Sequence, residues 1–158
     1  MERSKTFLLK GNEMSNKAFW EKQFKLVEDI LKYRFDYDVI CMTDEMDRVE
    51  FDDKLVYVNS RCHPETKFYT LLHEYGHVEL YESSSNALCV SIPCYQTFAS
   101  HRYGKSHAAR LGTLIEEIEA WKLGRMLSIR ESLWIDVRKF EKTMNTCLMS
   151  YVRWAGKY

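Results

Sequence analysis

Large hydrophobic side chains recur at helical spacing near the start of the chain and then give way to shorter, alternating runs. The helical repeat predicts a helix over residues 15–34, with Ser15 or Asn16 as its cap. Runs rich in β-branched and aromatic side chains predict three strands, at residues 36–43, 49–51 and 54–58. Asp52 and Asp53, between the last two runs, predict a tight hairpin turn.

The rest of the chain has a helical pattern over most of its length. Pro64 suits the first turn of a helix, because its missing N–H would have no partner there, and the predicted helix spans residues 64–81. Residues 82–86, with the sequence ESSSN, predict a loop. Two further helices are expected over residues 108–127 and 134–154.

A helix, three strands and then more helices predict an α+β fold with a small three-stranded antiparallel sheet. We expect a single domain over residues 1–158, with residues 1–14 as a loose N-terminal arm. Hydrophobic residues make up 46% of the chain and charged residues 29%, which is typical of a folded, soluble domain.

Charge and cysteine content restrict the classes of function. Lysine and arginine number 23, as do aspartate and glutamate, so net charge gives no reason to expect binding to nucleic acid or to an anionic membrane. No apolar run is long enough to cross a bilayer, and the N-terminus lacks the features of a signal peptide. Five cysteines without a CxxC spacing argue against a disulfide framework. We therefore expect a cytoplasmic protein.

Residues 73–77, with the sequence HEYGH, form an HExxH motif inside the second predicted helix. Residues four apart lie on one face of a helix, so the imidazoles of His73 and His77 can bind one tetrahedral metal ion such as Zn²⁺. Glu74 projects to the side and is suited to act as general base toward a metal-activated water. The motif specifies three of its five positions and arises often by chance, but its place within a helix favours the metal site.

The helix that contains the motif has two distinct faces. Its apolar face comprises Phe68, Leu71, Tyr75 and Val78. The two histidines lie on a different face with Tyr69, and we expect that face to line a cleft. Gly76 inside a helix costs about 1 kcal/mol relative to alanine, so its presence predicts close approach by another backbone.

A catalytic zinc ion usually has three protein ligands, so one more is required. Glu117, on the helix predicted over residues 108–127, shares a face with the small residues Ala120 and Gly124, which would let that helix approach the histidines closely. Glu116 is the alternative third ligand. Glu119 lies nearly opposite Glu117 and is expected to be solvated.

At this point the sequence resembles the small gluzincin peptidases, especially the ImmA/IrrE-like group known as minigluzincins. Residues 56–60 followed by residues 68–77 resemble the strand, connector and active-site helix of that family, and residues 117–121, EIEAW, are similar to its second motif. The resemblance covers roughly residues 55–127. It implies a zincin-like fold in which His73, His77 and Glu117 bind zinc and Glu74 is the base.

The chain also departs from the family pattern. Trp121 stands where the family usually has asparagine or aspartate, which bears on the support of the metal site. Residues 82–107 have no recognisable counterpart, and no helix-turn-helix partner domain is present in the sequence. Stand-alone members of this type often occur in phages and mobile elements, so the resemblance implies such an origin.

Several other side chains are candidates for accessory roles. His101, Tyr103 or His107 could hydrogen-bond the oxyanion of a tetrahedral intermediate, although a basic surface loop accounts for them equally well. Arg110 lies about two turns before Glu117 and could pair with a carboxylate near the site.

The sequence thus supports three hypotheses. The first is a zinc-dependent peptidase that hydrolyses a protein or peptide substrate. The second is a catalytically silent, zinc-containing binding or regulatory module that acts through a protein partner. The third and weakest is nucleic-acid binding through residues 101–110, which salt-dependent binding would reveal. The substrate, the cleavage specificity and the oligomeric state do not follow from the sequence.

Overall fold

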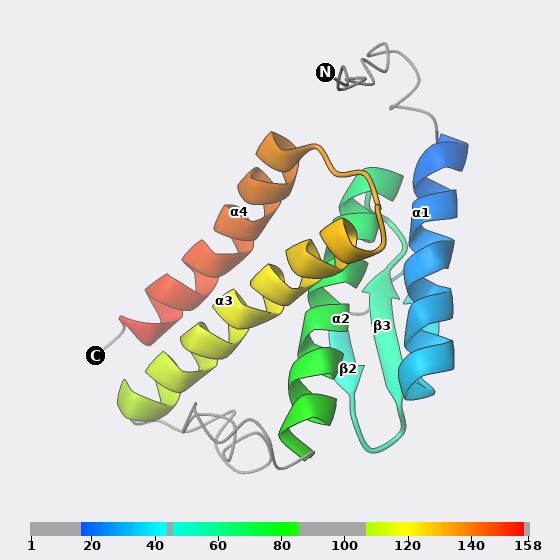
Figure 1. Ribbon diagram of the computed structural model, residues 1–158. Helices are drawn as coiled ribbons and strands as arrows, with labels where there is room; N and C mark the ends of the chain where they lie inside the picture. Colours follow the sequence, from blue (N-terminus) through cyan, green and yellow to red (C-terminus); the bar gives the residue numbers. More distant parts are fainter. Residues whose placement is uncertain (1–16, 44–45, 86–106, 157–158) are drawn as a thin grey trace, which may run out of the picture.

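The computed structural model describes residues 17–43, 46–85 and 107–156 (Figure 1). In these ranges the chain forms four α-helices, one π-helical turn and a three-stranded sheet, which confirms the α+β class. The elements are α1 Lys17–Ile30, η1 Leu31–Phe35, β1 Asp38–Met42, β2 Arg48–Glu50, β3 Leu55–Asn59, α2 Pro64–Ser85, α3 His107–Arg130 and α4 Val137–Ala155. No helix in these ranges is both long and apolar enough to span a bilayer.

The first predicted helix is present, but its last part is a π-helix rather than an α-helix. The α-helical part stops at Ile30, and η1 carries the chain on as a π-helix to Phe35. Asp36 then adopts a left-handed conformation with φ of 63°, and its backbone N–H donates to the carbonyl oxygens of Leu31 and Lys32 at the end of the helix. The proposed caps Ser15 and Asn16 lie outside the described residues.

The sheet is mixed, so the prediction of an antiparallel sheet was wrong in part. β2 and β3 form the expected antiparallel hairpin, with Val49 opposite Val56. β1, however, joins the other side of β3 in parallel, with Val39 opposite that same Val56. The physical reason is that β2 occupies one side of β3, so the chain between Met42 and Leu55 serves as the crossover that a parallel pair requires.

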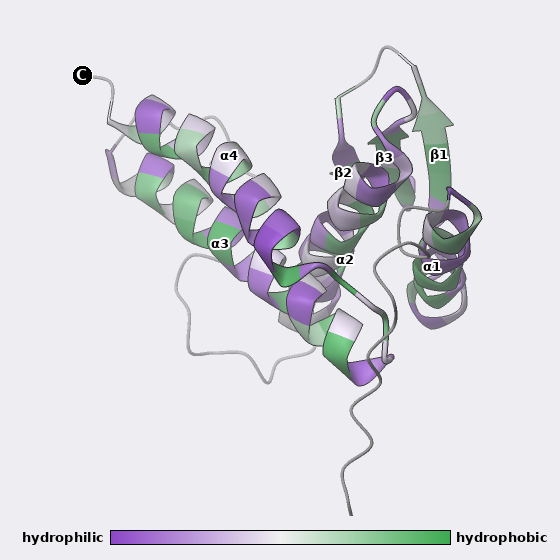
Figure 2. Ribbon diagram, turned by 90° about the horizontal axis from the view of Figure 1, so that it is seen from above, coloured by the Kyte–Doolittle hydropathy of each residue, from purple (hydrophilic) through white to green (hydrophobic). Residues whose placement is uncertain are grey.

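Helix α2 occupies the centre of the molecule. The sheet and α1 lie on one side of it, while α3 and α4 lie side by side on the other (Figures 1 and 2). The expected apolar face is buried, and Tyr69, His73 and His77 on the other face are buried as well. The reason is that α3 covers this face.

Helix α2 also runs to Ser85, beyond the predicted end, so most of the loop expected at residues 82–86 is helical. Glu82 has a partner that explains this extension, because the hydroxyl of Tyr37 donates a hydrogen bond of 3.1 Å to its carboxylate. Lys54 lies 3.7 Å from the same carboxylate group. These contacts tie the C-terminal part of α2 to the end of η1 and the start of the sheet.

Glycines allow the backbones of α2 and α3 to touch. A Cβ atom placed on Gly76 would lie 2.0 Å from the carbonyl oxygen of Ala120, and one placed on Gly124 would lie 2.3 Å from that of Leu72. Neither position can hold a side chain without separating the helices. The close approach expected from Gly76, Ala120 and Gly124 is therefore confirmed, and it sets the distance between the histidines and the glutamates of α3.

Helix α4 packs on α3 and is anchored at its first turn. Asp136 caps it by accepting hydrogen bonds from two backbone N–H groups, so the helix starts at Val137 rather than at residue 134. Lys139 and the hydroxyl of Tyr69 both donate to Glu65 at 2.9 Å, which joins α4 to the start of α2. Phe140, 1% exposed, fills the space between these helices.

Candidate metal centre

Three side chains from α2 and α3 converge at the crossing of the two helices. The Nε2 atoms of His73 and His77 lie 3.1 Å apart. Oε2 of Glu117 lies 3.2 Å from Nε2 of His73 and 3.6 Å from Nε2 of His77. The ligand-capable atoms of these three residues all fall within 4.8 Å of one another. The structure thus brings together the three residues that the sequence suggested as metal ligands.

The size of this triangle matches zinc coordination. Zn²⁺ bonds to imidazole nitrogen at about 2.0–2.1 Å, so two ligands of a tetrahedral ion lie about 3.3–3.4 Å apart. The observed separations of 3.1, 3.2 and 3.6 Å bracket that value. The three atoms can therefore form one face of a tetrahedron, which leaves the fourth position for a water molecule or a substrate atom.

The cluster is buried and incompletely hydrogen-bonded. His73 is 9% exposed, His77 2% and Glu117 3%. Within the described part of the chain, Oε2 of Glu117 and Nδ1 of both histidines have no hydrogen-bond partner of acceptable geometry. Buried polar atoms without partners are rare and costly, and a site for an ion is one of the recognised reasons for them. These residues therefore fit a metal ion.

Glu116 lies on the other side of His77. Its Oε1 atom is 3.4 Å from Nδ1 of His77, the ring nitrogen that faces away from the triangle. Burial opposes a positive charge on His77, but the contacts with Glu116 and then Glu117 outweigh burial and raise the pKa of His77 to about 10. Glu116, the alternative third ligand, is thus placed to orient His77, whereas Glu117 faces both Nε2 atoms.

The other two members of the triangle have pKa shifts in the opposite direction. Burial, followed by the charge of His77, lowers the pKa of His73 to about 4. Burial also disfavours ionisation of Glu117, but its contacts with His73 and His77 lower the pKa of Glu117 below the usual range. Without a metal ion, Glu117 is therefore ionised and His73 neutral at neutral pH, the forms that bind metal, whereas His77 carries a proton that an incoming zinc ion must displace.

Glu74 lies next to His73 on α2 and is 4% exposed. Its charge contributes to the raised pKa of His77, which places its carboxylate within electrostatic reach of the metal ligands. The HExxH spacing on one helix accounts for this arrangement. The proposed base is therefore part of the buried cluster rather than of an exposed cleft.

Two further residues lie near the site, and the sequence draws attention to only one of them. The Trp121 indole stacks on the His73 imidazole, with ring centroids 4.4 Å apart and an interplanar angle of 23°. Cys147 is on α4; partial burial raises the pKa of its thiol, and the carboxylates of Asp47, Glu117 and Glu74 raise it further. The sequence singles out Trp121 as a departure from the family pattern but does not predict its stacking on His73, and nothing in the pattern of α4 singles out Cys147.

The candidates for oxyanion stabilisation are not brought to the cluster by the described residues. His101 and Tyr103 lie outside them, and His107 is exposed at the first residue of α3. About 15 Å of helix axis separates His107 from Glu117. Arg110 lies over the ring of Trp154, 5.8 Å from its centroid.

Glu119 and the described cysteines are not part of the ligand triangle. Glu119 is 30% exposed and pairs with Lys122 at 2.6 Å, which fits the expectation that it faces solvent. Cys41, Cys62 and Cys147 are free thiols, while Cys89 and Cys94 lie outside the described residues.

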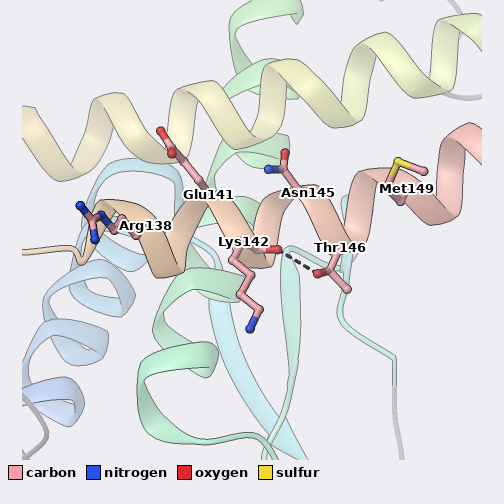
Figure 3. A pocket seen from close by; sticks show the side chains of 6 residues that line it. All are labelled: Arg138, Glu141, Lys142, Asn145, Thr146 and Met149. Atoms are coloured by element: carbon pink, nitrogen blue, oxygen red, sulfur yellow. Dashed lines mark hydrogen bonds between the residues drawn. The ribbon is translucent and has the colours of Figure 1, made fainter.

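Two surface hollows in the described part of the chain lie away from the cluster. One is formed by α4 alone, and Figure 3 shows its six side chains, from Arg138 to Met149, along that single helix. The other, of about 490 Å³, lies between α1 and the start of α2 and is lined by Trp20, Phe24 and several charged residues. No residue of the metal cluster lines either hollow.

Comparison with known proteins identifies no relative. No protein-family model, no curated protein and no solved structure matches this chain.

Proposed function

We propose that the protein is a zinc-dependent peptidase of the gluzincin type, as its resemblance to the ImmA/IrrE-like peptidases implies. The observation that carries this proposal is the triangle formed by His73, His77 and Glu117, whose edges are those of tetrahedral zinc coordination. Such a triangle requires two histidines four residues apart on one helix, a carboxylate on a second helix, and contact between the two helix backbones. All three requirements are met by this chain.

Each residue of the cluster has a distinct task in the proposed reaction. When bound, zinc polarises the peptide carbonyl and a water molecule. Glu74 accepts a proton from the attacking water and later delivers it to the leaving amine. Oε1 of Glu116 lies 3.4 Å from Nδ1 of His77, so its charge favours the orientation of that ring in which Nε2 faces Glu117 and His73.

Strand β2 provides a surface suited to a peptide substrate. It pairs with β3 on one side, and among the described residues its other edge has no partner strand. An extended peptide can add to such an edge through backbone hydrogen bonds. The strand also contacts α2, the helix that contains both histidines.

Replacement of Glu74 by glutamine tests the proposal. Glutamine has nearly the same shape but cannot accept the proton, so cleavage of a mixed library of unfolded peptides should fall by at least about 100-fold. Zinc content should stay near one ion per chain, because Glu74 is not a ligand. Glu119→Gln is the matched control, since Glu119 pairs with Lys122 at the surface, and it should retain full activity. Undiminished cleavage by Glu74→Gln would refute the mechanism.

The burial of the cluster favours one further candidate, a zinc-containing module without catalytic activity that acts through a protein partner. Glu74 is 4% exposed and His73 9%, and neither surface hollow described above reaches them. A structural or regulatory zinc ion needs no access for a peptide. In that case the protein binds zinc, cleaves no member of the peptide library, and binds its partner equally well after Glu74→Gln.

A further inference from the structure

Trp121 covers one face of the imidazole of His73. The ring centroids are 4.4 Å apart and the planes differ by 23°, which is a stacked arrangement. Trp121 is 2% exposed, so the indole belongs to the core and the contact is shielded from solvent. The imidazole of His77 meets the same His73 ring at 78°. One face of His73 is therefore fixed by an aromatic plane.

The two histidines differ in how their outer nitrogens are held. A histidine that binds a metal normally donates its second ring N–H to a carboxylate, a carbonyl or a water, and this bond sets the orientation of the ring. His77 has Glu116 at 3.4 Å from Nδ1 for this purpose. In the ranges that the structure describes, Nδ1 of neither histidine has a hydrogen-bond partner of acceptable geometry, and Nδ1 of His73 also has no carboxylate paired with it. For His73, another interaction must set the orientation.

Trp121 is itself held rigidly. It lies one turn after Glu117 on α3, and that helix is locked onto α2 by the contacts of Gly76 and Gly124. Phe140 of α4 meets the indole edge-on, with centroids 5.4 Å apart and an angle of 77°. The indole therefore cannot shift without moving either the third ligand or α4.

We propose that Trp121 is a positioning residue for the metal centre, which orients His73 by ring stacking where His77 is oriented by a carboxylate. The inference rests on the proposed zinc site. Stacking fixes the plane of the imidazole and so aims Nε2 at the point that it shares with His77 and Glu117. Loss of the indole would leave the ring free to rotate about its side-chain bonds.

The test is the zinc affinity of variants, measured by competition with a chromophoric chelator. Residues that orient metal ligands typically change affinity by about 10- to 100-fold when they are replaced. Trp121→Leu should therefore raise the Kd for zinc about 10- to 100-fold. Trp121→Phe keeps an aromatic plane and should stay within about threefold of the intact protein. Undiminished affinity in Trp121→Leu would overturn the inference.

A matched control separates orientation from general loosening of the core. Phe140→Leu removes an equally buried ring that touches Trp121 and Tyr69, and no ring contact joins it to His73. It should lower the melting temperature, while the Kd for zinc stays within about threefold of the intact protein. If Phe140→Leu weakens zinc binding as much as Trp121→Leu does, the specific role of Trp121 is refuted.

NMR of the zinc-loaded protein decides the matter even if Trp121→Leu does not fold. Carbon-bound protons of an imidazole stacked on an indole resonate upfield of ordinary histidine values, and Trp121→Phe should move those of His73 part of the way back. Unshifted His73 protons in the loaded intact protein would overturn the inference. An intact protein that binds no zinc would instead refute the proposed function, so the two failures are distinguishable.

Discussion

Gly76→Ala is predicted to destabilise the protein, although alanine is the better residue for a helix. On helix propensity alone this substitution would stabilise α2 by about 1 kcal/mol. The added Cβ atom, however, would lie 2.0 Å from the carbonyl oxygen of Ala120 and 2.7 Å from its Cα. Non-bonded carbon atoms are most stable at about 3.5–4.0 Å, so the two backbones must separate by roughly 1 Å or more.

The expected magnitude follows from two opposing effects. Overpacking of a closely packed interior costs about 1–3 kcal/mol and occasionally more, and a backbone carbonyl cannot rotate away as a side chain can. We expect a net loss of about 2 kcal/mol, which lowers the melting temperature of a chain of this size by about 4–8 °C. The separation also moves Glu117, one turn before Ala120, away from the histidines. Metal sites require ligand distances within about 0.2 Å, so zinc binding should weaken as well.

Thermal unfolding by circular dichroism, with a chelator present, measures the effect on the metal-free fold. Gly156→Ala is the matched control, because a Cβ atom there would lie 3.4 Å from the carbonyl oxygen of Val152 and its φ of −82° suits any residue. Its stability should change by less than about 0.5 kcal/mol. If Gly76→Ala is as stable as the intact protein or more so, the close backbone contact of α2 and α3 does not exist in solution.

Further predictions concern the charges and the metal of the cluster. Glu117→Gln should weaken zinc binding at least about 100-fold in calorimetric titration, while Glu119→Gln should not change it; equal losses would argue against Glu117 as a ligand. Zinc at 100 times its Kd should stabilise the intact protein by about 2.7 kcal/mol in thermal unfolding and should have no such effect on His77→Ala, so equal stabilisation of that variant would place the ion elsewhere. The metal-free protein should be most stable between pH 6 and 7 in urea titrations. Toward acid, stability falls by up to about 3 kcal/mol, because burial lowers the pKa of His73 from 6.5 to about 4 and only the unfolded chain takes up the proton. Toward alkali it falls because contacts with Glu116 and Glu117 raise the pKa of His77 to about 10 and only the folded chain keeps that proton; a flat profile would contradict both shifts.

The parts of the fold that could be predicted are those set by local chemistry. Pro64 marks the start of α2 because its ring suits the first helical turn, and the β2–β3 hairpin follows from two short apolar runs around adjacent aspartates. The convergence of Glu117 with the histidines could be anticipated because small residues in a helical pattern indicate where two helices touch. In the first two cases the determining residues are close together in sequence, and in the third the contact between distant helices is signalled by a local pattern on each helix.

Other features depend on contacts between distant segments and could not be predicted. β1 pairs with the edge of β3 that β2 leaves free, and strand composition does not encode that choice. The face of α2 that contains His73 is polar enough to suggest a cleft, yet α3 buries it. Likewise, the proximity of Cys147 to the cluster arises from the packing of α4 on α3. Helical periodicity gives the faces of an element but not the element that covers each face.

The buried position of the cluster explains why the contact between α2 and α3 must be so close. The reach of a glutamate side chain is limited, so Glu117 approaches Nε2 of both histidines only because the backbones of the two helices are in contact. Gly76 and Gly124 make this approach possible, and Ala120 adds little bulk between them. The same helix also places Trp121 against His73. A shift of α3 would therefore displace both Glu117 and the indole that stacks on His73. The geometry of the metal site therefore depends on one backbone contact, and mutations at that contact should affect stability and zinc affinity in parallel.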